Sequence, residues 1–99
     1  YSEFAESLGE LLLFLDDREK MAELLANASG QLSVLIGREI KEEEMADSAM
    51  IVAGYETARS RRGRIGVIGP KRIDYERVIP QLQYFAQTLG RYLSEVEED

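Results

Sequence analysis

The segment SAMIVAGYET, residues 48–57, constrains the fold most, because seven consecutive residues from Ala49 carry no charge and most are apolar. Neighbouring side chains of a strand point to opposite faces of a sheet. An apolar run of this kind therefore predicts a strand that is buried on both faces, near the centre of a sheet. A chain of 99 residues has room for one such core.

Two weaker segments supply partners for this central strand. Residues 32–36 alternate in a way typical of a strand that has one well-buried face and ends at Gly37. The polar stretch ARSRRG at 58–63 joins the central strand to a third strand at 65–68, which is a hairpin pattern. Residues 38–47 are strongly charged and are predicted to form a solvated connection with room for a short helical turn.

Helical periodicity precedes the predicted sheet. Ser2 is placed to cap a helix over residues 4–15, whose apolar surface is wide enough to predict cover by both the core and a partner. Asp16 followed by Glu19 resembles a capping box, so a second helix is predicted to start there and to end near Gly30. Its predicted inward residues are Met21, Leu24 and Leu25.

Helical periodicity returns after the third strand, with Asp74 as the predicted cap. Pro80 lies in the second turn and predicts either a kink after Ile79 or a helix that begins near Pro80. Residues 95–99 are predicted to be a frayed acidic tail. The predicted inward stripe consists of Tyr75, Val78, Ile79, Leu82, Phe85, Ala86, Leu89 and Leu93. The predicted fold class is thus α+β, a small antiparallel three-stranded sheet packed with two N-terminal helices and one long C-terminal helix.

Composition excludes most catalytic chemistry. The chain has no cysteine and no histidine, which removes disulfides, thiolate zinc sites, cysteine nucleophiles, imidazole bases and serine triads. The run at 42–44 lacks the spaced oxygens and the glycine of a calcium loop. We therefore predict no enzyme, no metal and no cofactor. No apolar run approaches the ~20 residues of a membrane span, and no signal-peptide pattern is present, so a soluble cytoplasmic protein without a membrane partner is expected.

Charge is unevenly distributed along the chain. The formal net charge is −7, but seven of the twelve cationic residues and only two acidic ones lie between 59 and 77, so that this window carries +5 and the rest −12. An acidic body repels nucleic acid at long range. We therefore interpret the basic hairpin at 59–64 as a solvated turn or an intersubunit ion-pair patch, and we favour both of these interpretations over a contact with DNA.

The stretch GRIGVIGPKRIDYERVIP, residues 63–80, raises the question of a phosphate-binding loop. Its glycines are three apart, unlike a dinucleotide fingerprint or a P-loop, and Pro70 deletes an amide that an anion nest would use. Two interpretations remain: a turn at Gly69–Pro70 after a strand that ends at Ile68, or an anion site near a helix start. The candidate residues are Gly66, Gly69, Pro70, Lys71, Arg72, Asp74 and Tyr75.

The same stretch resembles the C-terminal signature of the bacterial heat-inducible transcription repressors of the HrcA family. VLIGREI at 34–40 and MADSAMIVAGYE at 45–56 are similar to two of that family's strands, and residues 1–25 to its preceding helical segment. The resemblance thus covers nearly the whole chain and is most specific at 63–80. The sequence departs from the family pattern at Ile40, Lys71 and Ile73, where asparagine, threonine and methionine are usual.

Members of this family are described as dimers with an N-terminal winged-helix DNA-binding domain, a GAF-like domain and an inserted dimerisation segment. They repress chaperone operons at an inverted-repeat operator, and the GroE chaperonin is thought to keep them active. The resemblance implies that residues 1–99 are a single domain, the C-terminal part of the GAF-like domain of a longer repressor, without its winged helix. A start at Tyr1, inside a predicted helix, fits an excised piece.

The resemblance also implies a function and partners. The expected function is regulation and dimerisation, and the expected partners are a second copy, operator DNA through the missing N-terminal domain, and GroE. The alternative is a GAF-like sensor of a small ligand or anion, for which Lys71, Arg72 and Tyr75 are the first residues to test.

Overall fold

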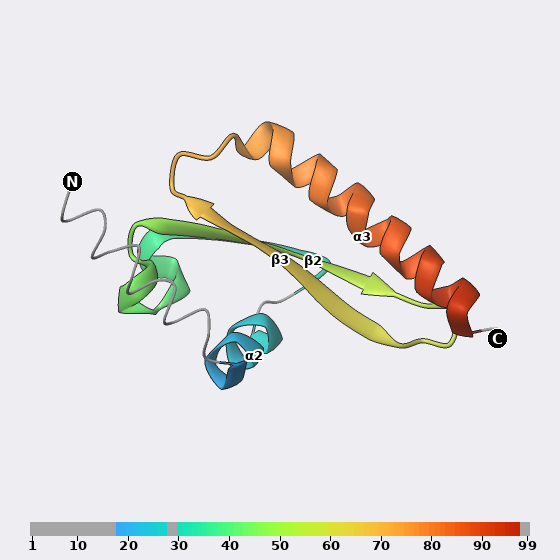
Figure 1. Cartoon of the computed structure of the whole chain (residues 1–99). Coiled ribbons are helices and arrows are strands. Elements are labelled where there is room, and N and C mark those ends of the chain that lie inside the picture. Colours follow the sequence, from blue (N-terminus) through green and yellow to red (C-terminus); the bar gives the residue numbers. More distant parts are fainter. Residues whose placement is uncertain (1–17, 28–29, 98–99) are drawn as a thin grey trace.

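The computed structural model describes residues 18–27 and 30–97, which form an α+β fold (Figure 1). The predicted first helix, its cap Ser2 and the predicted start of the second helix at Asp16 lie outside the described residues. In chain order the elements are helix α2 (Arg18–Asn27), strand β1 (Leu32–Ile36), the 3₁₀ helices η1 (Gly37–Ile40) and η2 (Glu43–Met45), strands β2 (Ser48–Glu56) and β3 (Arg62–Pro70), and helix α3 (Tyr75–Glu97).

The three strands form one antiparallel sheet in the order β1-β2-β3. The central position predicted for residues 48–57 is confirmed, because the first six residues of β2 are all buried. Ile51 shows why: it lies opposite Val34 on one neighbouring strand and Val67 on the other. Because β1 and β3 lie on its two sides, β2 could be exposed only through the two faces of the sheet, and apolar clusters cover both faces.

Helix α3 covers one face of the sheet, and α2 lies on the opposite face (Figure 1). On the α3 side, Ile51 and Ala53 of β2 pack with Leu82 and Ala86 of α3 in a buried cluster. Apolar residues of β2 thus alternate between two cores, as the two-residue repeat of a strand requires. The half-buried residues around this cluster are Leu32, Val34, Tyr55, Ile65, Val67, Ile73, Tyr75, Val78 and Ile79.

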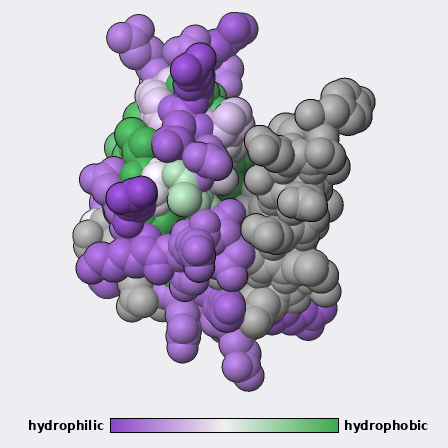
Figure 2. All heavy atoms as spheres, turned by 90° about the vertical axis from the view of Figure 1, so that its left-hand side faces the viewer, coloured by the Kyte–Doolittle hydropathy of each residue, from purple (hydrophilic) through white to green (hydrophobic). Residues whose placement is uncertain are grey.

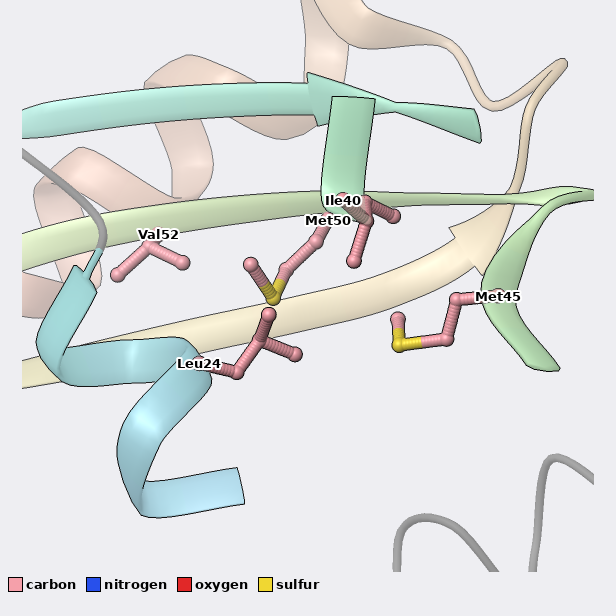
Figure 3. Packing of buried hydrophobic residues seen from close by; sticks show 5 residues of the cluster. All are labelled: Leu24, Ile40, Met45, Met50 and Val52. Atoms are coloured by element: carbon pink, nitrogen blue, oxygen red, sulfur yellow. The ribbon is translucent and has the colours of Figure 1, made fainter. Parts of the chain in front are cut away.

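The second core lies between the sheet and α2 (Figure 3). Leu24 of α2 extends toward Met50 of β2, as the helical periodicity predicts for an inward residue. Ile40 and Met45, from η1 and η2, are 4% and 0% exposed and complete this core. The prediction of a solvated connection at 38–47 was therefore wrong for these two side chains, since each short helix turns one apolar residue under the sheet.

Strand β3 is longer than predicted at both ends. Gly69 pairs with Ala49 and Pro70 with Ser48, so that the prediction of a strand ending at Ile68 and a turn at Gly69–Pro70 was wrong. A proline is tolerated here because β3 is an edge strand and Pro70 is its last residue, where no backbone donor is required. The chain turns instead over residues 71–74.

Helix α3 also differs from its prediction. It begins at Tyr75 and contains Pro80, so the helix does not start at the proline. Phe85, predicted to face the core, has 58% of its surface exposed. The helix continues to Glu97, so residues 95–97 are not a frayed tail. The reason is a set of contacts between this end of α3 and the β2–β3 hairpin, described below.

Candidate functional site

The candidate residues Gly69 to Tyr75 lie together where β3 leads into α3. A Cβ added at Gly69 would lie 2.8 Å from Cγ2 of Ile73, so the turn folds back over the glycine and leaves no room for a side chain. Arg72 is exposed in this turn. The carbonyl of Asp74 accepts hydrogen bonds from the backbone N–H groups of Arg77 and Val78, as the residue just before a helix does.

The polar groups of Lys71 and Tyr75 have partners within the chain. The Tyr75 hydroxyl donates a hydrogen bond of 2.6 Å to the Lys71 carbonyl, which closes the turn. The Lys71 ammonium lies 3.7 Å from a carboxylate oxygen of Asp47, and its backbone N–H donates to the Asp47 carbonyl at 3.3 Å. These groups therefore tie the turn to the start of β2.

Gly37, which directly follows β1, lies beside the contact between Lys71 and the residues just before β2. Its φ is +61°, and a Cβ there would lie 3.1 Å from the Ala46 carbonyl oxygen and 3.3 Å from Cδ of Lys71. The end of β1, the start of β2 and the end of β3 thus meet at one corner of the sheet, as an antiparallel order demands. Gly37, Asp47 and Lys71 belong to the three segments that carry the resemblance at 34–40, 45–56 and 63–80. We call these three residues the sheet corner.

Replacing Gly37 by Ala is expected to lower the free energy of unfolding by about 1 kcal/mol or somewhat more, because a left-handed φ strains an L-residue and the methyl group meets a carbonyl. Gly30 is the matched control, since its φ is +77° but a Cβ there meets nothing closer than 4.0 Å. Gly30→Ala carries the backbone strain alone and should cost less. Urea denaturation followed by circular dichroism measures both, and equal losses would contradict the contact at Gly37.

Gly66 is separate from the other candidate residues. It lies in the middle of β3, opposite Val52, and a Cβ there would lie 3.2 Å from a methyl group of Leu25 on α2. This is the face of the sheet turned away from α3. The glycine therefore allows α2 to approach the sheet, and it does not form part of a loop with Gly69.

A second polar constellation, which was not predicted from the sequence, joins the hairpin to the end of α3. The Glu97 carboxylate accepts hydrogen bonds from the Thr57 hydroxyl at 2.6 Å and from the Arg59 backbone N–H at 3.2 Å, and it lies 3.6 Å from Nε of Arg61. Ser94 accepts a hydrogen bond from the Ala58 N–H at 2.8 Å. We call Thr57, Arg59, Arg61, Ser94 and Glu97 the hairpin–helix network.

The hairpin–helix network places a carboxylate where the helix dipole disfavours it, since Glu97 is the last residue of α3. The hydrogen bond from Thr57, followed by the one from the Arg59 N–H and the charges of Arg61 and Arg59, lowers the pKa of Glu97 against the opposing effect of burial. No sequence pattern signals this arrangement, because residues 57 and 97 are 40 positions apart.

A lowered pKa in the folded state predicts the pH dependence of stability. Glu97 contributes stability fully above its unfolded pKa, and this contribution is lost as the pH falls through the lower folded value. We therefore expect the wild-type chain to lose more stability than Glu97→Gln between about pH 5 and pH 3. Urea titrations of both proteins across this range measure the difference. Parallel curves would contradict the role given to the carboxylate.

A cavity of about 510 Å³ adjoins the hairpin–helix network. Arg59, Arg61 and Arg62 line it on one side and Leu93 and Val96 of α3 on the other. Arg62 also lies 3.7 Å from Glu56, so that the basic hairpin is partly neutralised by the protein's own acidic residues. Within residues 18–27 and 30–97 no group of three or more potential ligands is arranged to hold a metal ion. Over the same ranges no helix has the length and apolar character needed to cross a membrane.

Comparison with known proteins identifies the family. A family model described as the HrcA protein C terminal domain matches residues 1–79, which include all three strands and the sheet corner. The chain belongs to the HrcA family. The resemblance noted at 63–80 is thereby confirmed, and the sheet corner is the place where its three segments meet. The residues matched end one position before Pro80, inside α3.

Curated relatives in the HrcA family carry the name heat-inducible transcription repressor HrcA. The one from Natranaerobius thermophilus is 41% identical over 80 residues, which are 81% of this chain and 23% of that protein. The one from Lachnoclostridium phytofermentans is 39% identical over 83 residues, covering 79% and 24%. The one from Rhizobium johnstonii is 39% identical over 93 residues, covering 88% and 26%. The chain thus spans about a quarter of the length of these relatives. No solved structure matches it.

Proposed function

We propose that this chain is the regulatory and dimerisation domain of a heat-inducible repressor of chaperone operons. The observation that carries the proposal is the family match over residues 1–79 together with relatives named as heat-inducible transcription repressors. In this proposal the chain is the C-terminal part of a GAF-like domain. The full-length protein binds an inverted-repeat operator through a winged-helix domain that this chain does not include.

The charge of the chain supports the part of the proposal in which another domain, and not this one, contacts the operator. The net charge of −7 opposes attraction to phosphate, and two hairpin arginines, Arg61 and Arg62, are within ion-pair distance of Glu97 and Glu56. We expect no shift of an operator fragment by the 99-residue chain in a gel at physiological salt. Because the relatives are named as repressors, the proposal includes no catalytic activity, and it places the protein in the cytoplasm, where its DNA target lies.

The same proposal includes two protein partners, a second copy of this chain and the GroE chaperonin. The sequence feature that motivated self-association, the wide apolar stripe at residues 4–15, lies outside the described residues. Sedimentation of the 99-residue chain at high micromolar concentration tests self-association. Co-purification of the full-length protein with GroE tests contact with the chaperonin.

Repression of a chaperone-operon reporter by the full-length protein tests the function itself. We expect repression at low temperature and its release after heat shock. Ile51→Asp places a charge in the core of this domain and is expected to abolish repression, although the DNA-binding domain is unchanged. Gln87→Ala, at an exposed position of α3, is the control and should repress normally. Full repression by Ile51→Asp would overturn the proposed regulatory role.

The alternative function, a sensor of a small ligand or anion, stays a prediction. Its first candidates, Lys71 and Tyr75, already have partners in Asp47 and in the Lys71 carbonyl, which favours a structural part for the turn. Thermal unfolding with inorganic phosphate or nucleotides decides the matter. A ligand at a hundredfold excess over its dissociation constant would stabilise the chain by about 2.7 kcal/mol, and we expect no such stabilisation.

A further inference from the structure

The outer flank of α3 exposes large apolar and aromatic side chains. Tyr84, Phe85, Tyr92 and Val96 are 67%, 58%, 60% and 52% exposed. They account for four of the five exposed large hydrophobic residues within the described part of the chain, the fifth being Ile36. Single exposed apolar residues need no explanation, but several on one helix indicate a surface that another molecule covers. Phe85 follows the same periodicity as the buried positions, which is why it was predicted to face the core.

The apolar residues of this flank follow a heptad spacing. The stripe consists of Val78, Leu82, Phe85, Leu89, Tyr92 and Val96, which alternate at intervals of four and three residues. An α-helix has 3.6 residues per turn, so a 3.5-residue repeat drifts around a straight helix by ~20° per heptad. Within the stripe Leu82 is buried, Val78 and Leu89 are half-buried, and Phe85, Tyr92 and Val96 are exposed, so the stripe follows the border between the sheet-covered and the solvent-exposed sides of α3. We call these six residues the α3 seam.

The surroundings of the α3 seam are depleted of charge. Residues 78–90 contain no charged side chain, although 31% of the chain is charged. Their exposed members include Gln81, Gln83, Tyr84 and Thr88. Cores of protein interfaces show this combination of few charges and many aromatic residues, whereas a solvated helix face carries Lys and Glu. Spacing, exposure and composition thus point independently to an interface.

Members of the seam also contact apolar groups outside it: Leu82 belongs to the buried cluster against which Ile65 and Val67 pack. Val96 lines the cavity beside the hairpin–helix network, and Ile65 and Val67 of the edge strand β3 are half-buried on the α3 side of the sheet. Figure 2 views the end of the molecule at which β3 turns into α3. Among the coloured residues it shows hydrophobic side chains at the surface, at the height of the sheet and α3, with hydrophilic ones around them.

We propose that the α3 seam packs against the α3 seam of a second copy of this chain, with the two helices antiparallel. The inference rests on the proposed dimerisation function and specifies its surface. A self-complementary stripe suits a two-fold axis, because the same residues then face each other. An antiparallel pair opposes the two helix dipoles, and it brings exposed Arg77, near the start of one helix, toward exposed Glu95, near the end of the other.

The length and width of the seam limit the contact area of the expected dimer, and thereby its affinity. Residues 78–96 span ~27 Å at 1.5 Å per residue, and a helix is ~10 Å wide. A contact of this length along one helix falls in the lower size class of specific interfaces. We therefore expect a reversible dimer whose population depends on protein concentration.

Two variants of the 99-residue chain test the proposal. Phe85→Glu places a charge in the seam and is expected to weaken dimerisation at least about tenfold in sedimentation equilibrium. Because the chain has no cysteine, Thr88→Cys introduces a single thiol near the midpoint of the seam, where two antiparallel helices bring the two copies together. We expect it to form an intermolecular disulfide under mild oxidation. Gln87→Cys is the matched control, since residue 87 is also exposed but helical geometry places it on the side of α3 away from the seam, and it should remain largely monomeric.

The outcomes separate this inference from the function on which it rests. Circular dichroism establishes that each variant is folded. If the chain dimerises but Phe85→Glu dimerises equally well and Thr88→Cys cross-links no better than Gln87→Cys, the seam is not the interface and the dimerisation function stands. If the unmodified chain and the full-length protein are both monomeric, both ideas fail. If Phe85→Glu destabilises the full-length protein without changing its oligomeric state, another segment of the same chain covers the seam and the second copy is excluded.

Discussion

Replacing Ile51 by Ala is expected to lower the free energy of unfolding by about 3 kcal/mol, a large part of the 5–15 kcal/mol that holds a typical domain together. Ile51 is 0% exposed and packs with Leu82 and Ala86 of α3 in the buried cluster on the α3 side of the sheet. The substitution removes apolar atoms and leaves a cavity, because the side chains opposite it on β1 and β3 are held in register and cannot collapse into the space. Urea denaturation followed by circular dichroism measures the loss.

Ile36→Ala is the matched control for Ile51→Ala. Ile36 is the same residue type on an edge strand, but it is 38% exposed and lies at the end of β1. Less apolar surface is returned to water and little cavity forms, so we expect a loss of less than about 1 kcal/mol. Similar losses for the two variants would contradict the central position of β2 between two cores.

Replacing Gly90 by Ala is expected to destabilise the chain by about 2 kcal/mol, although helix propensity alone predicts a gain of about 1 kcal/mol. A Cβ at Gly90 would lie 2.8 Å from the backbone carbonyl oxygen of Glu56. A carbonyl in a paired strand cannot move away as a flexible side chain does. The end of α3 must therefore lift from β2, which also weakens the hydrogen bonds from Ala58 to Ser94 and from Thr57 to Glu97.

The exposed position Gln87 provides the converse control. Gln87→Gly should cost about 1 kcal/mol, since glycine is a poor helix former and residue 87 is exposed. Glycine is thus expected to be harmful at 87 and required at 90, within one turn of the same helix. Stabilisation by Gly90→Ala in urea denaturation would show that α3 does not approach β2 as closely as described.

Local sequence patterns predicted the sheet well. The run at 48–57 predicted a central strand, and β2 is buried over its first six residues. Alternation at 32–36 and the hairpin at 58–63 placed the other two strands correctly in order, because burial against one core repeats every second residue along a strand. The length of β3 was missed, since glycine and proline usually end a strand and only an edge position allows Pro70 to pair with Ser48.

The candidate residues were located by sequence, but their roles came from contacts. The motif at 63–80 identified the turn that carries Gly69, Lys71 and Tyr75, and the structure adds the reasons for those residue types: Ile73 over Gly69, and Asp47 beside Lys71. Gly37 and Lys71 are 34 positions apart in the sequence, and their approach depends on the order of the strands. No periodicity within either segment contains that information.

The sequence by itself determined the type and order of α2, the three strands and α3, and the family, because periodicity, turn residues and motifs are local properties of the chain. Tertiary structure alone decided which side of α3 is covered. Phe85 and Leu82 belong to the same periodic stripe, yet one is exposed and the other buried, since a single sheet covers only part of a helix surface. It also decided that Glu97 is the anchor of the hairpin–helix network, because a contact across 40 residues exists only once α3 crosses back over β2.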